Sequence, residues 1–252
     1  MSATFANSYD PKSASEQPVA LPSAPPLFLS EFEVLQPPLS RRGTGPGIIL
    51  ILPPPEDLNL RTEGVKPLDP EPVQKWAEEG FAVAGVTPKS PDWSFQQSLE
   101  SCIDSLVGLE QLDISEKFAI IVYDPKLVTS IISSVAKDPR IAGLVFYGSS
   151  PSLDDFHIPT MAHLTVGSTS GTSTPSFTTH VYPSPSPYFV LPQVVEYDPG
   201  SSSLSHSRTL VFLRKWLGGP TFDLEAIWEE HTYFEFEDRS VAKTMGTMVV
   251  CL

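Results

Sequence analysis

Short runs of apolar residues recur along the middle of the chain, separated by stretches with a different spacing. The runs do not alternate between apolar and polar residues, so they predict strands that are buried on both faces of a sheet. They cover residues 47–53, 81–86, 118–123 and 141–147. The stretches between them carry apolar residues at helical spacing. They cover 67–80, 94–112 and the residues after 124. This alternation predicts right-handed βαβ units, and therefore an α/β fold whose mostly parallel sheet has helices on both faces.

The pattern continues towards the C-terminus and then changes. Residues 161–166 and 177–182 predict two later strands, and 201–217 predicts a helix. The sequence Gly218-Gly219-Pro220 breaks that helix, and 223–238 then predicts a new amphipathic helix. Such a break followed by a fresh helix is typical of a domain junction.

Both ends of the chain differ in composition from its middle. Residues 1–30 are rich in Ser, Pro and Ala and have no hydrophobic periodicity, so they are predicted to be disordered. We therefore expect a disordered N-terminus over 1–30, an α/β domain over 31–218 and a C-terminal helical tail over 219–252.

Charge and cysteine content restrict the class of partner. A net charge of −14 argues against nucleic acid and against an anionic membrane surface as partners. No apolar run approaches the roughly 18 residues of a membrane-spanning helix, and the N-terminus shows no secretory signal, so we expect a cytoplasmic protein. The two cysteines, Cys102 and Cys251, predict neither a disulfide framework nor a metal site, and no cofactor is expected.

The turn after the strand 118–123 reads Tyr123-Asp124-Pro125-Lys126. Asp is a preferred N-cap and Pro is tolerated at the first helical position, so we expect Asp124 to cap the helix that follows. A sharp strand-to-helix turn is also where an α/β hydrolase carries its nucleophile. This turn contains no Ser, Cys or Gly.

The order and spacing of several segments resemble the dienelactone hydrolase family of α/β hydrolases. The resemblance covers roughly 45–217, and its segments are 47–53, 76–84, 142–148 and 197–213. Residues 224–249 are similar to the linker and opening helix of the SnoaL-like (NTF2-like) domain that follows the hydrolase domain in fungal two-domain members. The resemblance implies an α/β-hydrolase-type sheet followed by the beginning of a truncated second domain.

The resemblance also implies a Cys, Asp, His triad, and other residues stand at all three of its positions. Asp124 occupies the nucleophile turn. The loop 167–176 has no Asp or Glu for the triad acid, and no histidine lies between His180 and His206. The first strand leads into Pro53-Pro54-Pro55, which offers no backbone N–H to an oxyanion. Because a triad acts as a unit, we expect a pseudoenzyme.

Two residues remain open as replacements for the missing groups. Asp124 could act as a carboxylate nucleophile, and His180, on a strand near the site, could act as a displaced general base. With them the protein would hydrolyse esters or lactones, as a carboxymethylenebutenolidase does. Of the other histidines considered, His163 is predicted to be a satisfied strand residue, His206 to be solvated, and His231 to lie on a solvated acidic helix face rather than in a metal site.

Three hypotheses follow for the function. The first is a dienelactone hydrolase-like protein that has lost hydrolysis and keeps a pocket at the carboxyl ends of its strands. A small hydrophobic acid or lactone is its expected ligand, by analogy alone. The second is an active hydrolase that uses Asp124. The third is an interaction protein that self-associates through its C-terminal helix.

Overall fold

The computed structural model describes residues 10, 12–16, 24–62, 68–89, 93–136, 138–148, 158–168, 174 and 176–248. The chain divides into two compact units. One comprises residues 24–221, and the other comprises 1–23 together with 222–252.

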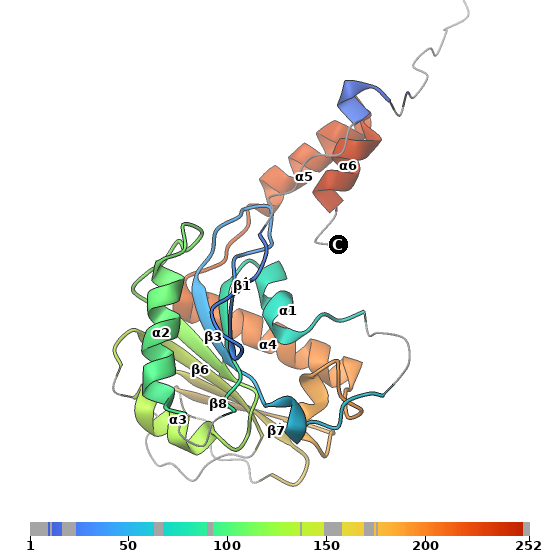
Figure 1. Cartoon of the computed structure of the whole chain (residues 1–252). Helices are drawn as coiled ribbons and strands as arrows, with labels where there is room; N and C mark the ends of the chain where they lie inside the picture. The colour runs from blue at the N-terminus through green and yellow to red at the C-terminus, as the bar shows by residue number, and fades with distance from the viewer. Residues whose placement is uncertain are drawn as a thin grey trace, which may run out of the picture. The chain divides into compact units, whose positions relative to one another are not determined.

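The larger unit is built on a single sheet of eight described strands (Figure 1). Its order is β1-β2-β4-β3-β5-β6-β7-β8. β2 pairs antiparallel with β1 and with β4, and all the later pairs are parallel. This is the predicted α/β-hydrolase-type sheet. The strands are β1 (Leu27–Phe28), β2 (Glu33–Gln36), β3 (Gly47–Ile51), β4 (Ala82–Val86), β5 (Phe118–Val122), β6 (Ile141–Gly148), β7 (Thr160–Thr165) and β8 (Phe177–Tyr182).

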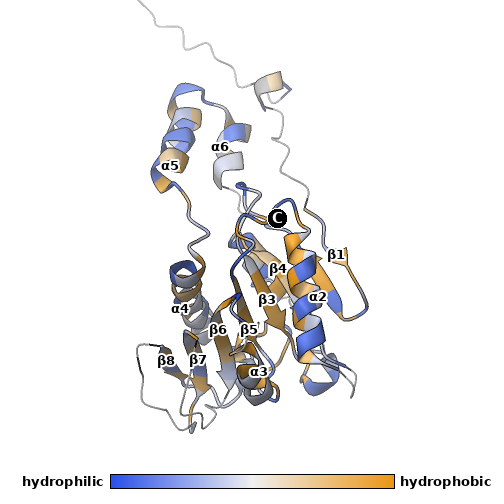
Figure 2. Ribbon diagram, turned by 90° about the vertical axis from the view of Figure 1, so that its left-hand side faces the viewer, coloured by the Kyte–Doolittle hydropathy of each residue, from blue (hydrophilic) through white to orange (hydrophobic). Residues whose placement is uncertain are grey.

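Helices cover both faces of this sheet, and each face has its own hydrophobic cluster. On one face α2 (Phe95–Val107) and α3 (Val128–Val135) pack against Ile49, Ile120 and their neighbours. On the other face α1 (Pro72–Glu78) and α4 (Pro199–Leu217) pack against Ile48, Ile121 and theirs. The central strands are accordingly apolar throughout, while α2 alternates between apolar and polar positions (Figure 2). The prediction of a parallel sheet buried on both faces is confirmed.

The predicted elements are present, with shifted ends. The helix predicted over 67–80 begins at Pro72, and the one predicted over 94–112 ends at Val107. The hairpin of β1 and β2 was not predicted, because both strands are short and β1, at the edge of the sheet, is exposed. Within the segment predicted to be disordered, Leu27–Phe28 form β1, so the sheet unit begins before residue 31.

The smaller unit is formed by short helices. They are the 3-10 turn η1 (Ala14–Glu16), α5 (Leu224–Thr232), the π-helical segment η4 (Tyr233–Glu237) and α6 (Val241–Met248). Asp223 caps α5 by accepting the N–H of Ala226 at 3.0 Å, and Glu16 accepts the N–H of Ala242 at 3.2 Å. The single helix predicted over 223–238 is thus an α-helix that continues as a π-helical segment, with α6 as an additional helix.

Candidate functional site

Asp124 is the second residue after the end of β5 and stabilises the turn that leads to α3. Its carboxylate accepts the backbone N–H of Lys126 at 2.9 Å, and its carbonyl accepts the N–H of Leu127 at 3.2 Å. The helix begins only at Val128, and its N-cap residue Leu127 makes no side-chain cap. The predicted position of the cap was therefore wrong, because Pro125 to Leu127 form a turn before the helix instead of its first residues. Asp124 stabilises that turn, not the end of the helix.

A close contact with β6 keeps the turn tight. Gly148, the last residue of β6, has a φ of +132°, and a Cβ added there would lie 2.8 Å from the Cβ of Pro125. Only glycine leaves room for Pro125 in this conformation. The turn that would present a nucleophile is thus closed by Gly148 on the neighbouring strand, which the sequence pattern around Asp124 does not reveal.

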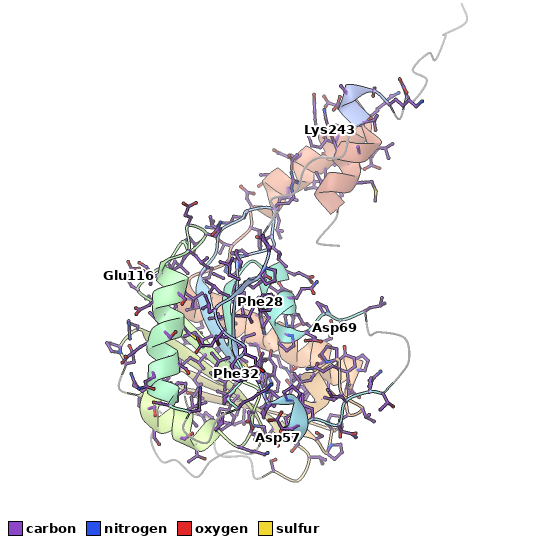
Figure 3. The ribbon with its side chains drawn as sticks, viewed as in Figure 1. Phe28, Phe32, Asp57, Asp69, Glu116 and Lys243 are labelled. Atoms are coloured by element: carbon purple, nitrogen blue, oxygen red, sulfur yellow. The ribbon has the colours of Figure 1, made fainter. Side chains whose placement is uncertain are left out.

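The surroundings of Asp124 disfavour its ionised form. Its side chain is buried, and burial raises its pKa above the ordinary 3.8, with the nearby charge of Asp57 acting in the same direction. The backbone N–H that Lys126 donates to the carboxylate lowers this pKa, and the Lys126 ammonium, which is paired with Asp57 at 2.7 Å, acts in the same direction. Asp57 lies in η2 (Pro55–Asp57), which follows β3 closely at the carboxyl edge of the sheet (Figure 3). Among the described charged groups that act on Asp124, none is a histidine.

His180 lies far from this turn. It is on β8, three strands away from β5, which at about 4.8 Å per strand corresponds to about 14 Å. A row of rings fills the space between them. Tyr123 stacks on Tyr147 at 5.1 Å, Tyr147 on His163 at 4.7 Å, and His163 on His180 at 5.9 Å between ring centroids. The two candidate residues are therefore not brought together.

His163 is the fully buried centre of this row, and all its hydrogen-bonding capacity is used. Its Nδ1 lies 2.9 Å from the Tyr182 hydroxyl, and its Nε2 lies 2.7 Å from the Thr209 hydroxyl. Arg208 donates to the Tyr182 oxygen at 3.0 Å. Burial holds the pKa of His163 well below 6.5, so its ring is neutral near pH 7. The prediction of a satisfied histidine is confirmed.

His180 faces a pocket instead of the nucleophile turn. The pocket has a volume of about 440 Å³ and lies between α4 and the strands β7 and β8. Thr160 and Thr178, which line it, belong to the amino-terminal halves of their strands, so this pocket is not the one expected at the carboxyl ends. Burial lowers the pKa of His180, and the charge of Arg208 acts in the same direction.

Arg208 and Lys215, both on α4, also line this pocket, and sequence reasoning missed them. The spacing of residues within 201–217 could have indicated them. Arg208, Val211, Phe212 and Lys215 stand at i, i+3, i+4 and i+7, which places two cations and two apolar residues on one helical face. The prediction for this helix rested on its inward apolar residues and on His206.

The remaining candidates have structural roles. Cys102 is buried in α2, and burial raises the pKa of its thiol to about 12, so it is not a reactive thiolate. His206 was predicted to be solvated, which is wrong: its ring lies 4.4 Å from the Trp76 ring, tilted by 36°, and its Nε2 is hydrogen-bonded to Glu79 at 2.9 Å. His231 bonds the Thr247 hydroxyl at 2.6 Å within the smaller unit.

Two further findings concern ligands and membranes. The described residues contain no group of three or more His, Cys, Asp or Glu side chains arranged to hold a metal ion. Among the described helices, none has both the length and the apolar character needed to cross a bilayer.

Most of the loop predicted to lack the triad acid, residues 169–173 and 175, lies outside the described residues.

Comparisons with known proteins identify no family. A scan against family models finds no match, and neither does a search of curated proteins. Among solved structures, one similar chain is from Klebsiella pneumoniae and is named a dienelactone hydrolase. It is 11% identical, the match covers 75% of this chain and 92% of that one, and the TM-score is 0.43. A dienelactone hydrolase from Anabaena variabilis is 12% identical over 77% of this chain and 97% of that one, with a TM-score of 0.44.

Proposed function

We propose that this protein is a dienelactone hydrolase-like member of the α/β-hydrolase fold that does not hydrolyse esters or lactones and acts by binding a small organic acid or lactone. The proposal rests on the hydrogen bonding and burial of Asp124. Its carboxylate is engaged by the backbone N–H of Lys126 and is buried in the turn where a nucleophile would stand.

The electrostatics of the turn support the same proposal. A carboxylate attacks only in its ionised form, and the raised pKa of Asp124 increases the protonated fraction. The described residues place no histidine beside it to activate a water molecule for the second half of a hydrolytic cycle. His163 is locked between Tyr182 and Thr209, and His180 lies three strands away.

The oxyanion side of the turn supports it further. The strand β3 leads into Pro53, Pro54 and Pro55, none of which has a backbone N–H to donate to a developing negative charge. Oxyanion donors are among the largest contributions to acyl transfer. Residues 53–55 therefore supply no oxyanion donor beside the turn.

Chemical trapping tests the proposal. If Asp124 attacked p-nitrophenyl acetate, its oxygen would bond to the acetyl carbon, p-nitrophenolate would leave, and a mixed anhydride would remain on Asp124. Hydroxylamine, added after the free ester has been removed, attacks either carbonyl of such an anhydride. At the acetyl carbon it releases acetohydroxamate and restores Asp124, and at the Asp124 carbon it releases acetate and leaves a hydroxamate that peptide mapping by mass spectrometry locates. We expect the wild-type protein to give no more of either product than the Asp124→Asn variant does. A hydroxamate on Asp124, or an excess of acetohydroxamate that Asp124→Asn does not give, would contradict the proposal.

A second candidate function is self-association through the C-terminal helices. It is favoured by the exposure of large apolar side chains in the smaller unit: Leu224 is 74% exposed, Trp228 66% and Phe236 65%. If these helices mediate self-association, light scattering should give an oligomer for the full chain and a monomer for a chain ending at Thr221. A monomer in both cases would contradict self-association.

We also propose, from the sequence resemblance, that residues 219–252 correspond to the linker and opening helix of a SnoaL-like domain.

A further inference from the structure

We propose that the pocket between α4 and the strands β7 and β8 binds a small aromatic carboxylate. The inference deepens the proposed function, because it rests on the view that the protein acts by binding, and it names the place and the class of ligand. It does not depend on Asp124, since the pocket is separated from that turn by the row of rings that ends at His180.

The size of the pocket suits a small organic molecule. Its volume of about 440 Å³ lies within the usual range of ligand sites, about 300 to 1,000 Å³. The face of α4 that carries Arg208, Val211 and Lys215 lines it, together with Thr178 and His180 of β8. Two elements distant in sequence therefore line one open volume.

The charge of the pocket is opposite to that of the chain. The protein has 30 acidic and 16 basic residues. The described residues that line the pocket nevertheless include Arg208 and Lys215, and no Asp or Glu. Within the described part of the chain, neither cation is in an ion pair with a carboxylate. A pocket with two uncompensated cations in an acidic protein selects an anion.

Arg208 is oriented to receive a carboxylate. Its guanidinium lies over the Tyr182 ring, 5.4 Å from the centroid, and donates to the Tyr182 hydroxyl through Nη1. Among the described residues, Tyr182 is its only hydrogen-bond partner, so the Nε and Nη2 edge is available for a paired interaction with two carboxylate oxygens. His180, kept neutral by its lowered pKa, lines the same pocket and can donate a further hydrogen bond.

The rest of the pocket fits a flat apolar body. Lys215 stands seven residues after Arg208 on the same helix, which corresponds to about 10 Å along the axis at 1.5 Å per residue. Val211, Phe212 and Trp216 line the pocket on this helix, and the Lys215 ammonium lies 4.8 Å from the centroid of the Trp216 ring. Val211 is 69% exposed, so an aromatic ring that covers it removes apolar surface from water. The arrangement thus offers a carboxylate site at one end and an aromatic platform beside it.

Calorimetric titration of the full-length protein with 2-naphthoate tests the inference. We expect saturable binding at one site, with an affinity that falls as sodium chloride is added because the contact is charged. The neutral analogue 2-naphthylmethanol has the same body without the charge, and we expect it to bind at least about tenfold more weakly, the ratio that corresponds to about 1.4 kcal/mol.

Matched variants on one helix locate the site. Val211→Glu places a carboxylate in the middle of the pocket, on an exposed helical position where the fold tolerates it, and should abolish naphthoate binding. Leu204→Glu makes the same chemical change seven residues earlier on the same face of α4, outside the pocket, and should leave binding unchanged. Lys215→Gln should weaken binding several-fold, whereas Lys117→Gln, which removes a lysine elsewhere, should not.

Three results would overturn the inference: no saturation with naphthoate, equal binding of the neutral alcohol, or equal effects of Val211→Glu and Leu204→Glu in folded proteins. None of these results depends on hydroxamate formation at Asp124. The experiments therefore show separately whether the pocket binds an aromatic carboxylate and whether the protein lacks hydrolytic activity.

Discussion

At the residue scale, Asp124 combines a polar role with an apolar environment. The residue is 4% exposed, yet its side chain supplies the acceptor that closes the turn after β5. Asparagine provides the same carbonyl acceptor without a charge to bury. Asp124 therefore contributes through the position of its acceptor oxygen, and ionisation of its buried carboxyl group lowers the stability of the fold.

Substitution of Asp124 separates these two properties. Asp124→Ala removes the acceptor and should lower the free energy of unfolding by about 1 kcal/mol, as the loss of a side-chain cap does. Asp124→Asn keeps the acceptor and should match or exceed the wild type near pH 7. Urea titrations at fixed pH measure both values. An Asn variant as unstable as the Ala variant would show that the charge itself stabilises the turn.

The same pair of proteins should respond differently to pH. Because folding raises the pKa of Asp124, the folded state binds more protons than the unfolded state from about the ordinary pKa of 3.8 up to the raised one. The stability that Asp124 contributes is thus fully present below 3.8 and is lost as the pH rises through the raised pKa. Unfolding of Asp124→Asn, measured against the wild type from pH 3.5 to 7, should show a stability difference that moves in favour of the variant as the pH rises. A constant difference would contradict a raised pKa.

At the element scale, the junction of β5, β6 and α3 depends on one glycine. Gly148→Ala brings a methyl group within 2.8 Å of Pro125 and places an alanine at a φ of +132°. We expect a loss of about 1–3 kcal/mol in the free energy of unfolding, the usual cost of a residue held in such a conformation, together with displacement of the turn. Gly43→Ala is the control, since Gly43 also has a positive φ, +68°, but nothing within 4 Å of an added Cβ. Equal losses for the two variants would show that the contact with Pro125 is unimportant.

The sequence predicted the bounds of the most apolar strands best. β3, β5 and β6 are buried along almost their whole length, so apolar runs located them within a residue or two. β1 and β2 are short, and β1 is exposed, so no run marks them. The start of α3 was misplaced because Asp124 and Pro125 favour a helix start locally, whereas packing of Pro125 against Gly148 imposes a turn first.

The sites were less predictable than the elements, for a physical reason. His163 and His180 are adjacent in space only because β7 and β8 pair in a register that places them opposite each other. Arg208 reaches the same region from α4, 28 residues beyond His180 in the chain. Such a cluster depends on strand register and helix placement, neither of which the spacing of residues along the chain determines.

At the scale of the whole molecule, the sheet unit has a core of its own. Every residue of both hydrophobic clusters lies between Leu35 and Leu217. A chain that ends at Thr221 should therefore unfold cooperatively, with a midpoint in urea close to that of the full-length protein. Circular dichroism during urea titration measures this. A broad transition, or a midpoint shifted far downward, would show that the C-terminal helices belong to the folding unit.

The central claim is that the turn after β5 stabilises the fold and does not perform hydrolysis. The most direct test is the steady-state hydrolysis of p-nitrophenyl acetate and of a dienelactone by the wild-type protein and by Asp124→Asn, with both proteins shown to be folded. The account predicts that both release product at the same rate as buffer alone. Turnover by the wild type that disappears in Asp124→Asn would contradict it.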